Sequence, residues 1–320
     1  MIDSNTAGNG NDERRDRWAG QSPWAEAGVD RQDYPPGLYV VATPLGNAAD
    51  VTLRALWVLR LADCIAAEDT RTTAPLLARF GVAHARRDVV ALHRHNEAQA
   101  SEALVARIAQ GQRVALVTDA GTPAISDPGA VLVRAVLDAG LRVIPVPGPS
   151  SLAAALSAAG VHSSSFRFAG FPPTRGKERT RFFAEIGRGS EASVIFEAPH
   201  RVADTARELA SALEPARRVI VARELTKKFE SIVQTTAQNL DAAIAQGEER
   251  GEFVLVVDAP AHVKPGGEDL EIQVDEHTER WLRALAEELP ASRAAAVAAK
   301  ASGLPREVLY RLLVGPRDVV

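Results

Sequence analysis

Residues 113–129 have the sequence RVALVTDAGTPAISDPG, and this stretch decides the fold. Its first five residues are largely apolar and predict a buried strand. The next twelve contain two Gly, two Pro and two Asp, and a helix is predicted over 129–139. Ligands of open parallel sheets bind beyond the carboxyl ends of the strands, so a long polar loop at that position predicts a binding site.

The same alternation of short apolar strands and amphipathic helices extends on both sides of this stretch. Strands are predicted at 38–41, 64–67, 89–92, 113–117 and 143–146, with a helix after each of the first four. Continuous apolar runs are typical of strands that are covered on both faces. We therefore predict an α/β fold with a parallel, doubly wound N-terminal sheet.

A second set of elements follows the Pro- and Ser-rich segment Pro147–Ser151 and extends from 166 to 258. Strands near 193–196, 218–222, 230–234 and 253–257 often succeed one another directly, which favours a mixed second sheet. Three terminal helices with a turn at 302–304 predict a small helix-turn-helix module. The expected organisation is a disordered tail at 1–36, α/β domains at 37–148 and 149–260, a linker at 261–277 and the helical module at 278–320.

Composition excludes several classes of protein. The chain has 320 residues, with 37 basic and 41 acidic side chains and a net charge of −4, so any polyanion site must be a local patch. Cys64 is the single cysteine, which excludes an intrachain disulfide. No stretch of 18 apolar residues and no signal sequence is present, so we expect a cytoplasmic protein that does not span a membrane.

Two more predicted strand ends carry polar or strained loops. In 42–47 (ATPLGN), Pro44 and Gly46 fit a tight turn whose N–H groups face a ligand, or a plain connection. In 67–73 (AEDTRTT), Glu68 and Asp69 could supply a general base, whereas Asp69 could instead cap the following helix.

The third polar strand end is 93–97 (HRHNE). Two His residues two positions apart on an extended segment point to opposite faces, so a substrate contact is favoured over a metal site. Asn96 could equally cap the helix that begins there.

Taken together, motifs along the chain resemble those of one family. They occur in order at 43–47, 66–71, 93–97, 119–123, 126–129, 147–150 and 223–227. The chain resembles the bacterial 16S rRNA (cytidine-2′-O)-methyltransferases, within the tetrapyrrole methylase superfamily of class III S-adenosylmethionine methyltransferases. The resemblance covers residues 37–260, and the terminal helices are similar to the module appended in that family. Two departures are Phe196–Arg201, where the family more often has Tyr and Ser, and Thr122, where the superfamily often has Asp.

The resemblance implies that S-adenosyl-L-methionine binds in a cleft between the two α/β domains. It assigns cofactor contacts to Thr122, Ile125, Ser150, Ser151, Glu197 and Ala222, and the loop chemistry adds Asp119 and Gly121. It also implies a homodimer and a decoding-centre cytidine of the small ribosomal subunit as substrate. The residues themselves, with one cysteine and the two His on opposite faces, lead us to expect no metal.

Methylation of a ribose hydroxyl requires a proton acceptor. The candidates are Glu68, Asp69 and Lys227, the last only if burial lowers its pKa; otherwise Lys227 is a phosphate-binding cation. Residues 175–181 carry four basic side chains against one acid and suit an RNA backbone, or form a solvated helix face. The expected substrate contacts are Pro44, Gly46, Arg71, His95, Asn96, Arg175 and Lys177.

Two other functions compete with this one. A corrin or porphyrin methyltransferase of the same superfamily shares the cofactor motifs, but the 66–71 and 93–97 motifs resemble the rRNA family. A non-enzymatic RNA-binding regulator would use the terminal helices, and the intact loop at 119–123 argues against it.

Overall fold

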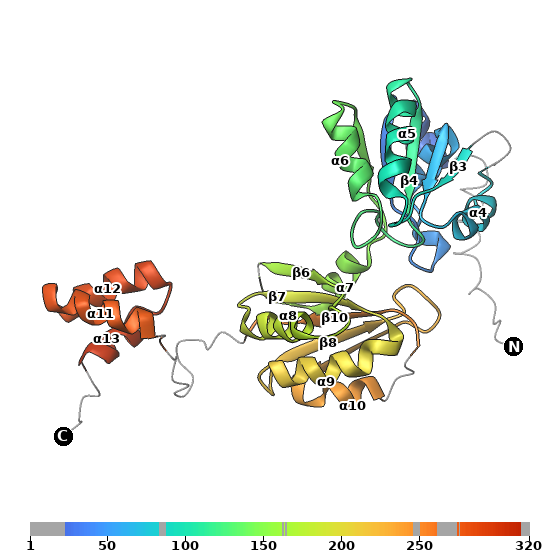
Figure 1. Cartoon of the computed structure of the whole chain (residues 1–320). Coiled ribbons are helices and arrows are strands. Elements are labelled where there is room, and N and C mark those ends of the chain that lie inside the picture. Colours follow the sequence, from blue (N-terminus) through green and yellow to red (C-terminus); the bar gives the residue numbers. More distant parts are fainter. Residues whose placement is uncertain are drawn as a thin grey trace, which may run out of the picture. The chain divides into compact units, whose positions relative to one another are not determined.

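The computed structural model describes residues 23–82, 88–161, 163, 165–245, 250–260, 274 and 276–314. The chain divides into a unit of residues 1–260, which contains two sheets, and a unit of residues 261–320, which contains three helices (Figure 1). Most of the linker expected at 261–277 lies outside the described residues.

The first sheet consists of five parallel strands in the order β3-β2-β4-β1-β5. Helices α3 and α4 pack on one face, and α5 and α6 pack on the other. The predicted parallel, doubly wound sheet is confirmed. Its elements are β1 (Gly37–Val41), α3 (Leu53–Leu61), β2 (Cys64–Ala67), α4 (Thr70–Arg79), β3 (Asp88–Ala91), α5 (Glu97–Ala109), β4 (Arg113–Val117), α6 (Ala130–Asp138) and β5 (Val143–Val146).

The carboxyl end of β4 is a topological switch point. β4 lies between β1 and β2, and the helices that follow β1 and β2 cover one face of the sheet. Helix α6, which follows β4, covers the opposite face. The chain leaving β4 therefore diverges from both of its neighbours, and this is the edge at which open α/β sheets bind ligands.

The second sheet is mixed, as predicted, with the order β6-β7-β10-β8-β9. Strands β6 and β7 are parallel, and the other neighbouring pairs are antiparallel. Helix α7 covers one face, while α8, α9 and α10 cover the other. The elements are α7 (Ser151–Ala159), β6 (Phe166–Gly170), α8 (Lys177–Arg188), β7 (Ala192–Glu197), α9 (Val202–Ala212), β8 (Arg218–Arg223), β9 (Ser231–Thr236), α10 (Leu240–Ala245) and β10 (Phe253–Val257).

The prediction of a disordered tail through residue 36 is wrong for residues 23–36. A short helix, α2 (Pro23–Glu26), places Trp24 against Trp57 of α3 with 5.7 Å between ring centroids. The Arg60 guanidinium lies 4.4 Å from the Trp24 ring, and Val29 is buried. These isolated apolar residues have no periodicity in the sequence, and they become ordered by contacts with a distant surface.

The C-terminal unit is a three-helix module, as predicted. Its helices are α11 (Glu276–Glu288), α12 (Ala291–Ser302) and α13 (Arg306–Val314). They enclose a small core of Leu282, Ala295, Ala298 and Leu309. Gly303 ends α12 with a left-handed φ of 74°, which glycine adopts without steric cost.

Gly129, which precedes α6, has a φ of 127°, and a Cβ there would lie 2.6 Å from Leu116 Cδ2. Gly140 also has a positive φ, but nothing lies within 4 Å of a Cβ at that position. We predict that Gly129→Ala lowers the free energy of unfolding by about 1–3 kcal/mol more than Gly140→Ala, because it adds overpacking to backbone strain. Urea denaturation of both variants tests this, and equal losses would contradict it.

Candidate active site

The loop of residues 118–129, which follows β4, is fixed at its base to the loop after β1. The Thr43 N–H donates to the Gly121 carbonyl at 2.8 Å, and the Gly121 N–H donates to the Thr43 carbonyl at 3.0 Å. The buried Thr43 hydroxyl donates to the Thr118 carbonyl at 3.1 Å. These bonds connect the two loops directly across the switch point.

The far end of the loop is fixed by the 93–97 segment. Arg94 Nη2 donates to the Ser126 carbonyl at 2.8 Å. Glu97 Oε1 accepts hydrogen bonds from the N–H groups of Gly129 (2.8 Å) and Val131 (2.9 Å). Gly129 provides no side-chain cap for α6, so the Glu97 carboxylate stabilises that helix N-terminus from another helix.

The middle of the loop is strained. Ala124 (φ 66°) and Ser126 (φ 68°) are left-handed although neither is glycine, and Ile125 between them is exposed. Residues in sparsely populated conformations concentrate at ligand-binding and catalytic sites.

Three carboxyl groups meet around Thr118 at this edge. Glu68 Oε2 accepts hydrogen bonds from the Thr118 hydroxyl (2.5 Å) and from the Asp119 N–H (3.3 Å). Burial raises the pKa of Asp119, and the charges of Glu68 and Asp69 raise it further. Burial, with the charge of Glu68, raises the pKa of Asp127 to about 6, against the opposing effects of Thr118 and Arg94. A carboxyl group that titrates near neutral pH is suited to accept a proton.

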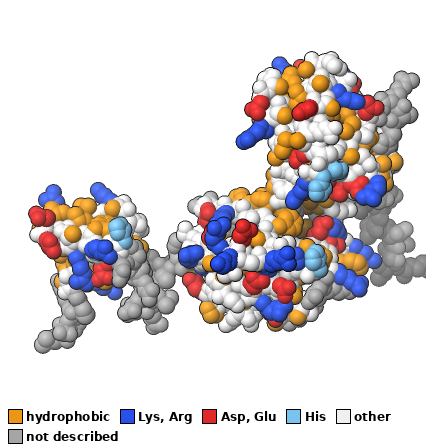
Figure 2. All heavy atoms as spheres, in the orientation of Figure 1, with side chains coloured by type: hydrophobic (Ala, Val, Ile, Leu, Met, Phe, Trp, Pro, Cys, Tyr) orange, Lys and Arg blue, Asp and Glu red, His pale blue; other side chains and the backbone are white. Residues whose placement is uncertain are grey.

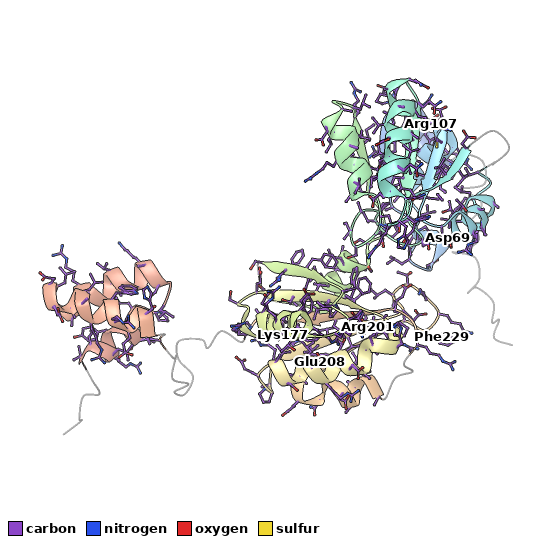
Figure 3. The ribbon with its side chains drawn as sticks, in the orientation of Figure 1. Asp69, Arg107, Lys177, Arg201, Glu208 and Phe229 are labelled. Carbon is purple, nitrogen blue, oxygen red and sulfur yellow. The ribbon has the colours of Figure 1, made fainter. Side chains whose placement is uncertain are left out.

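Asp69 takes the capping role that the sequence left open. Its Oδ1 accepts from the Arg71 N–H at 2.8 Å, and the Arg71 guanidinium contacts both carboxylate oxygens. These hydrogen bonds lower the pKa of Asp69 to about 2. Figure 3 labels Asp69 at the beginning of α4. Such a carboxylate is a weak base, which argues against Asp69 as the proton acceptor.

Lys227 is a cation rather than a base. Burial alone would lower its pKa, but the hydrogen bond from Nζ to Glu224 (2.9 Å) and the charge of Glu252 raise it overall. Lys227 was expected to act as a base only if burial lowered its pKa, and its pKa is raised instead. A Cβ at Gly46 would lie 2.3 Å from Lys227 Cγ, so Gly46 is covered by this lysine.

The structure brings together some of the predicted cofactor contacts. Thr122 Oγ1 donates to the Pro149 carbonyl at 2.9 Å, which joins the loop to the segment that starts α7. Ser150 caps α7, and Ser151 is its first residue. Gly121 has a φ of 84°, and a Cβ there would lie 3.2 Å from Leu45 Cδ2. The backbone conformation of Gly121 and the nearby Leu45 side chain therefore both favour glycine at this position.

The side chains of three other predicted residues are buried. The Ala222 side chain is buried in the second sheet, and the Glu197 carboxylate is fully buried against Arg179 and Arg201. Neither side chain is open to a cofactor. Pro44 is also buried, so its side chain is not open to a substrate.

The 93–97 segment differs from the sequence expectation. His93 and His95 do not point to opposite faces, because the chain turns there and their rings lie 6.0 Å apart, edge to face. Asn96 accepts from the His93 N–H at 2.8 Å and donates to the Ala91 carbonyl at 2.9 Å, so its amide stabilises this turn. His95 is exposed.

Asp127, Arg94 and Glu97 are the residues of this site that the sequence reasoning missed. All three are charged residues within or beside the strand-end motifs, and that position was the available signal. The neighbours of each charged residue depend on the order of the strands in the sheet, and the motifs do not reveal that order. In the part of the chain that the structure describes, no group of His, Cys, Asp or Glu could hold a metal ion.

This fold and its strand-end site define a class of methyltransferase. The model for tetrapyrrole (corrin/porphyrin) methylases matches residues 37–241. The solved structure of the methyltransferase CobJ aligns with a TM-score of 0.54 at 21% identity over 72% of this chain and 97% of that one. That of CbiF, a cobalt precorrin-4 methyltransferase, aligns with a TM-score of 0.51 at 20% identity over 69% of this chain and 94% of CbiF. These two structures share the fold.

The chain belongs to the ribosomal RNA small subunit methyltransferase I family. It is 44% identical to the member from Neisseria meningitidis serogroup B over 86% of this chain and 92% of that protein. Identity to the Escherichia coli O157:H7 member is also 44%, over 86% and 93% of the two chains. The C-terminal helices match the RsmI C-terminal HTH domain over residues 272–315. The predicted family and the predicted enzyme class, an S-adenosylmethionine-dependent methyltransferase, are confirmed.

The raised pKa of Asp127 has a consequence for stability. Between its usual value of 3.8 and about 6, the folded state holds the proton more tightly than the unfolded state, so stability falls as the pH rises through this window. We predict that Asp127→Asn is more stable than the wild type at pH 7 by about 1–2 kcal/mol, because it removes the charge of a half-buried carboxylate that solvent partly screens. The difference should disappear near pH 3.

Urea unfolding of both proteins at pH 4, 5.5 and 7 measures this effect. Asp138→Asn, at an exposed position on α6, is the control and should show no such pH dependence. An Asp127→Asn protein that is less stable than the wild type at pH 7 would contradict the assignment.

Proposed function

We propose that this protein transfers a methyl group from S-adenosylmethionine to the ribose 2′-hydroxyl of a cytidine in the decoding centre of 16S rRNA. The observation that carries the proposal is the similarity to ribosomal RNA small subunit methyltransferase I over 86% of the chain. The match to the RsmI C-terminal HTH domain adds support, because it lies beyond the residues that match the tetrapyrrole methylase model.

The residues at the switch point fit the cofactor. Its candidate contacts are the loop residues Asp119, Gly121, Thr122 and Ile125, together with Ser150 and Ser151. The strained backbone at Ala124 and Ser126 supports this placement. When bound, S-adenosylmethionine supplies a sulfonium-activated methyl group. The task left to the protein is to align the acceptor oxygen and to take its proton.

Asp127 is the proposed proton acceptor, with Glu68 as its partner in the same cluster. Its pKa of about 6 leaves it ionised at neutral pH and a stronger base than Asp69, whose pKa is about 2. Glu68 already accepts the hydrogen of Thr118, so it orients that hydroxyl and contributes negative charge. Charged Lys227 is better placed to attract phosphate than to accept a proton.

The remaining proposals concern partners and location. RNA contacts are proposed for Arg71, His95, Arg175 and Lys177, whose side chains are exposed. A homodimer and a cytoplasmic location are proposed from the family resemblance. Within the described residues, no helix has the length and apolarity that a membrane crossing requires. A corrin or porphyrin methyltransferase remains the alternative, since CobJ and CbiF share the fold.

The function is tested by incubating the protein with tritiated S-adenosylmethionine and small ribosomal subunits from a strain that lacks the corresponding gene. We expect label in 16S rRNA, recovered after nuclease digestion as 2′-O-methylcytidine. Label in a base, or no label in rRNA together with transfer to a porphyrin, would overturn the proposal. Subunits from the parent strain, in which the site is already methylated, are the matched control.

The proton acceptor is tested by single-turnover methylation with Asp127→Asn and Asp69→Asn. Loss of a general base predicts a rate that falls by about 10²–10⁴-fold for Asp127→Asn and much less for Asp69→Asn. The wild-type rate should rise with pH through about 6 and then level off, because Asp127 must be deprotonated, and this limb should be absent in Asp127→Asn. A wild-type rate in Asp127→Asn with a large loss in Glu68→Gln would move the role to Glu68.

A further inference from the structure

Phe171, directly after β6, is an exposed aromatic side chain beside the candidate active site. It is 49% exposed, and its ring contacts Phe196 of β7 edge to face at 5.7 Å between centroids. Phe196 packs in turn on Phe168 at 4.9 Å. A ring supported in this way keeps its orientation and offers surface to a planar partner.

Gly170, the residue before Phe171, places the Phe171 ring next to the strained loop of residues 118–129. A Cβ at Gly170 would lie 3.8 Å from Ser126 Oγ, so the end of β6 contacts residues 118–129. Gly170 has a φ of 69°, which turns the chain at that point. Phe171 is therefore the next residue in the chain after Gly170, which contacts the loop that carries Asp127.

A buried ionic network fixes the backbone that follows Phe171. Arg201 Nη2 donates to the Pro172 and Pro173 carbonyls, and Arg179 Nη1 donates to the Pro173 carbonyl at 2.9 Å. Both guanidinium groups also contact the fully buried Glu197 carboxylate, Arg201 at 3.3 Å and Arg179 at 4.0 Å. Buried charges are retained only when they are well paired, so this network holds the turn in one conformation.

A polar cavity of about 360 Å³ lies close to Phe171 in the chain, since its first lining residue is Thr174. Three arginines line it, together with two carboxylates, of which Glu208 pairs with Arg179 at 2.8 Å. The lining residues are Thr174, Arg175, Gly176, Arg179, Thr180, Arg201, Asp204 and Glu208. Gly176 gives α8 no side-chain cap, so the positive end of the helix faces the same region. Figure 2 shows basic side chains gathered over α8, and Figure 3 labels Lys177, Arg201 and Glu208 in this part of the domain.

We propose that Phe171 stacks on a nucleobase of the RNA substrate while the adjacent cavity accepts a backbone phosphate of the same strand. The inference rests on the proposed function. Unpaired bases of RNA loops and single strands are recognised by stacking on aromatic side chains, and an exposed, supported ring offers such a surface. Glu197 is then a positioning residue for this turn, because both arginines that hold the turn also pair with its buried carboxylate.

The test compares Phe171→Leu, which keeps apolar volume without an aromatic face, with Phe171→Trp, which keeps the face. Filter binding of unmethylated small subunits should show a dissociation constant raised by about 5–150-fold in Phe171→Leu and within about threefold of the wild type in Phe171→Trp. Phe166→Ala, at an equally exposed ring (51%) at the other end of β6, is the matched control and should bind as the wild type does. The affinity for S-adenosylhomocysteine, measured by calorimetry, should be unchanged in all three variants.

Wild-type binding of subunits by Phe171→Leu would overturn the stacking role. Weakened S-adenosylhomocysteine binding in Phe171→Leu would overturn it as well, because the ring would then contact the cofactor. Failure of the proposed function is seen separately, as absence of methyl transfer by the wild-type protein to the same subunits.

Discussion

The pair of backbone hydrogen bonds between Thr43 and Gly121 is the constraint on which the rest of the site depends. It joins the loops that leave β1 and β4, at the point where the chain departs toward opposite faces of the sheet. With one end fixed there, Arg94 and Glu97 fix the other end of the same loop. The strain at Ala124 and Ser126 persists because the residues around them are held on both sides.

The same constraint brings carboxyl groups together without enough positive charge to neutralise them. Asp127 and Glu68 both contact Thr118, Asp119 follows Thr118 in the chain, and burial raises the pKa of the two aspartates. Such an arrangement reduces stability at neutral pH, and proteins retain costs of this kind where activity requires them. Arg71 and Asp69, a few residues away, show the opposite case: their charges are paired, the pKa of Asp69 is low, and the pair stabilises a helix N-terminus.

Much of the architecture was predictable because local patterns determine it. Apolar runs such as residues 113–117 and helical spacing on either side predicted the first sheet, four strands of the second and the terminal helices close to their observed bounds. Strand β6 of the second sheet was not predicted. The packing of Trp24 and the burial of Val29 were not predictable, since both depend on contacts that carry no local pattern. The segment at 93–97 was recognised, but its extended geometry was wrong because Asn96 stabilises a turn there.

The sequence predicted which loops form the site, but it did not predict the role of each residue in them. Residues 118–129 were identified from their length, Gly content and position after a strand. The roles of Asp69, Asp127 and Lys227 depend on which charges lie beside them, and strand order and burial decide that. Glu197 shows the same limit, because only the fold reveals that two arginines cover its carboxylate.

The central claim is that the loop fixed by Thr43 and Gly121 is a preformed cofactor site at the β4 switch point. Hydrogen exchange of the protein with and without S-adenosylhomocysteine tests it most directly. The account predicts that protection increases at residues 119–127 and 147–151, while β4 and α6 exchange as they do without ligand. Protection confined to other segments, or ordering of the whole first domain on binding, would contradict the account.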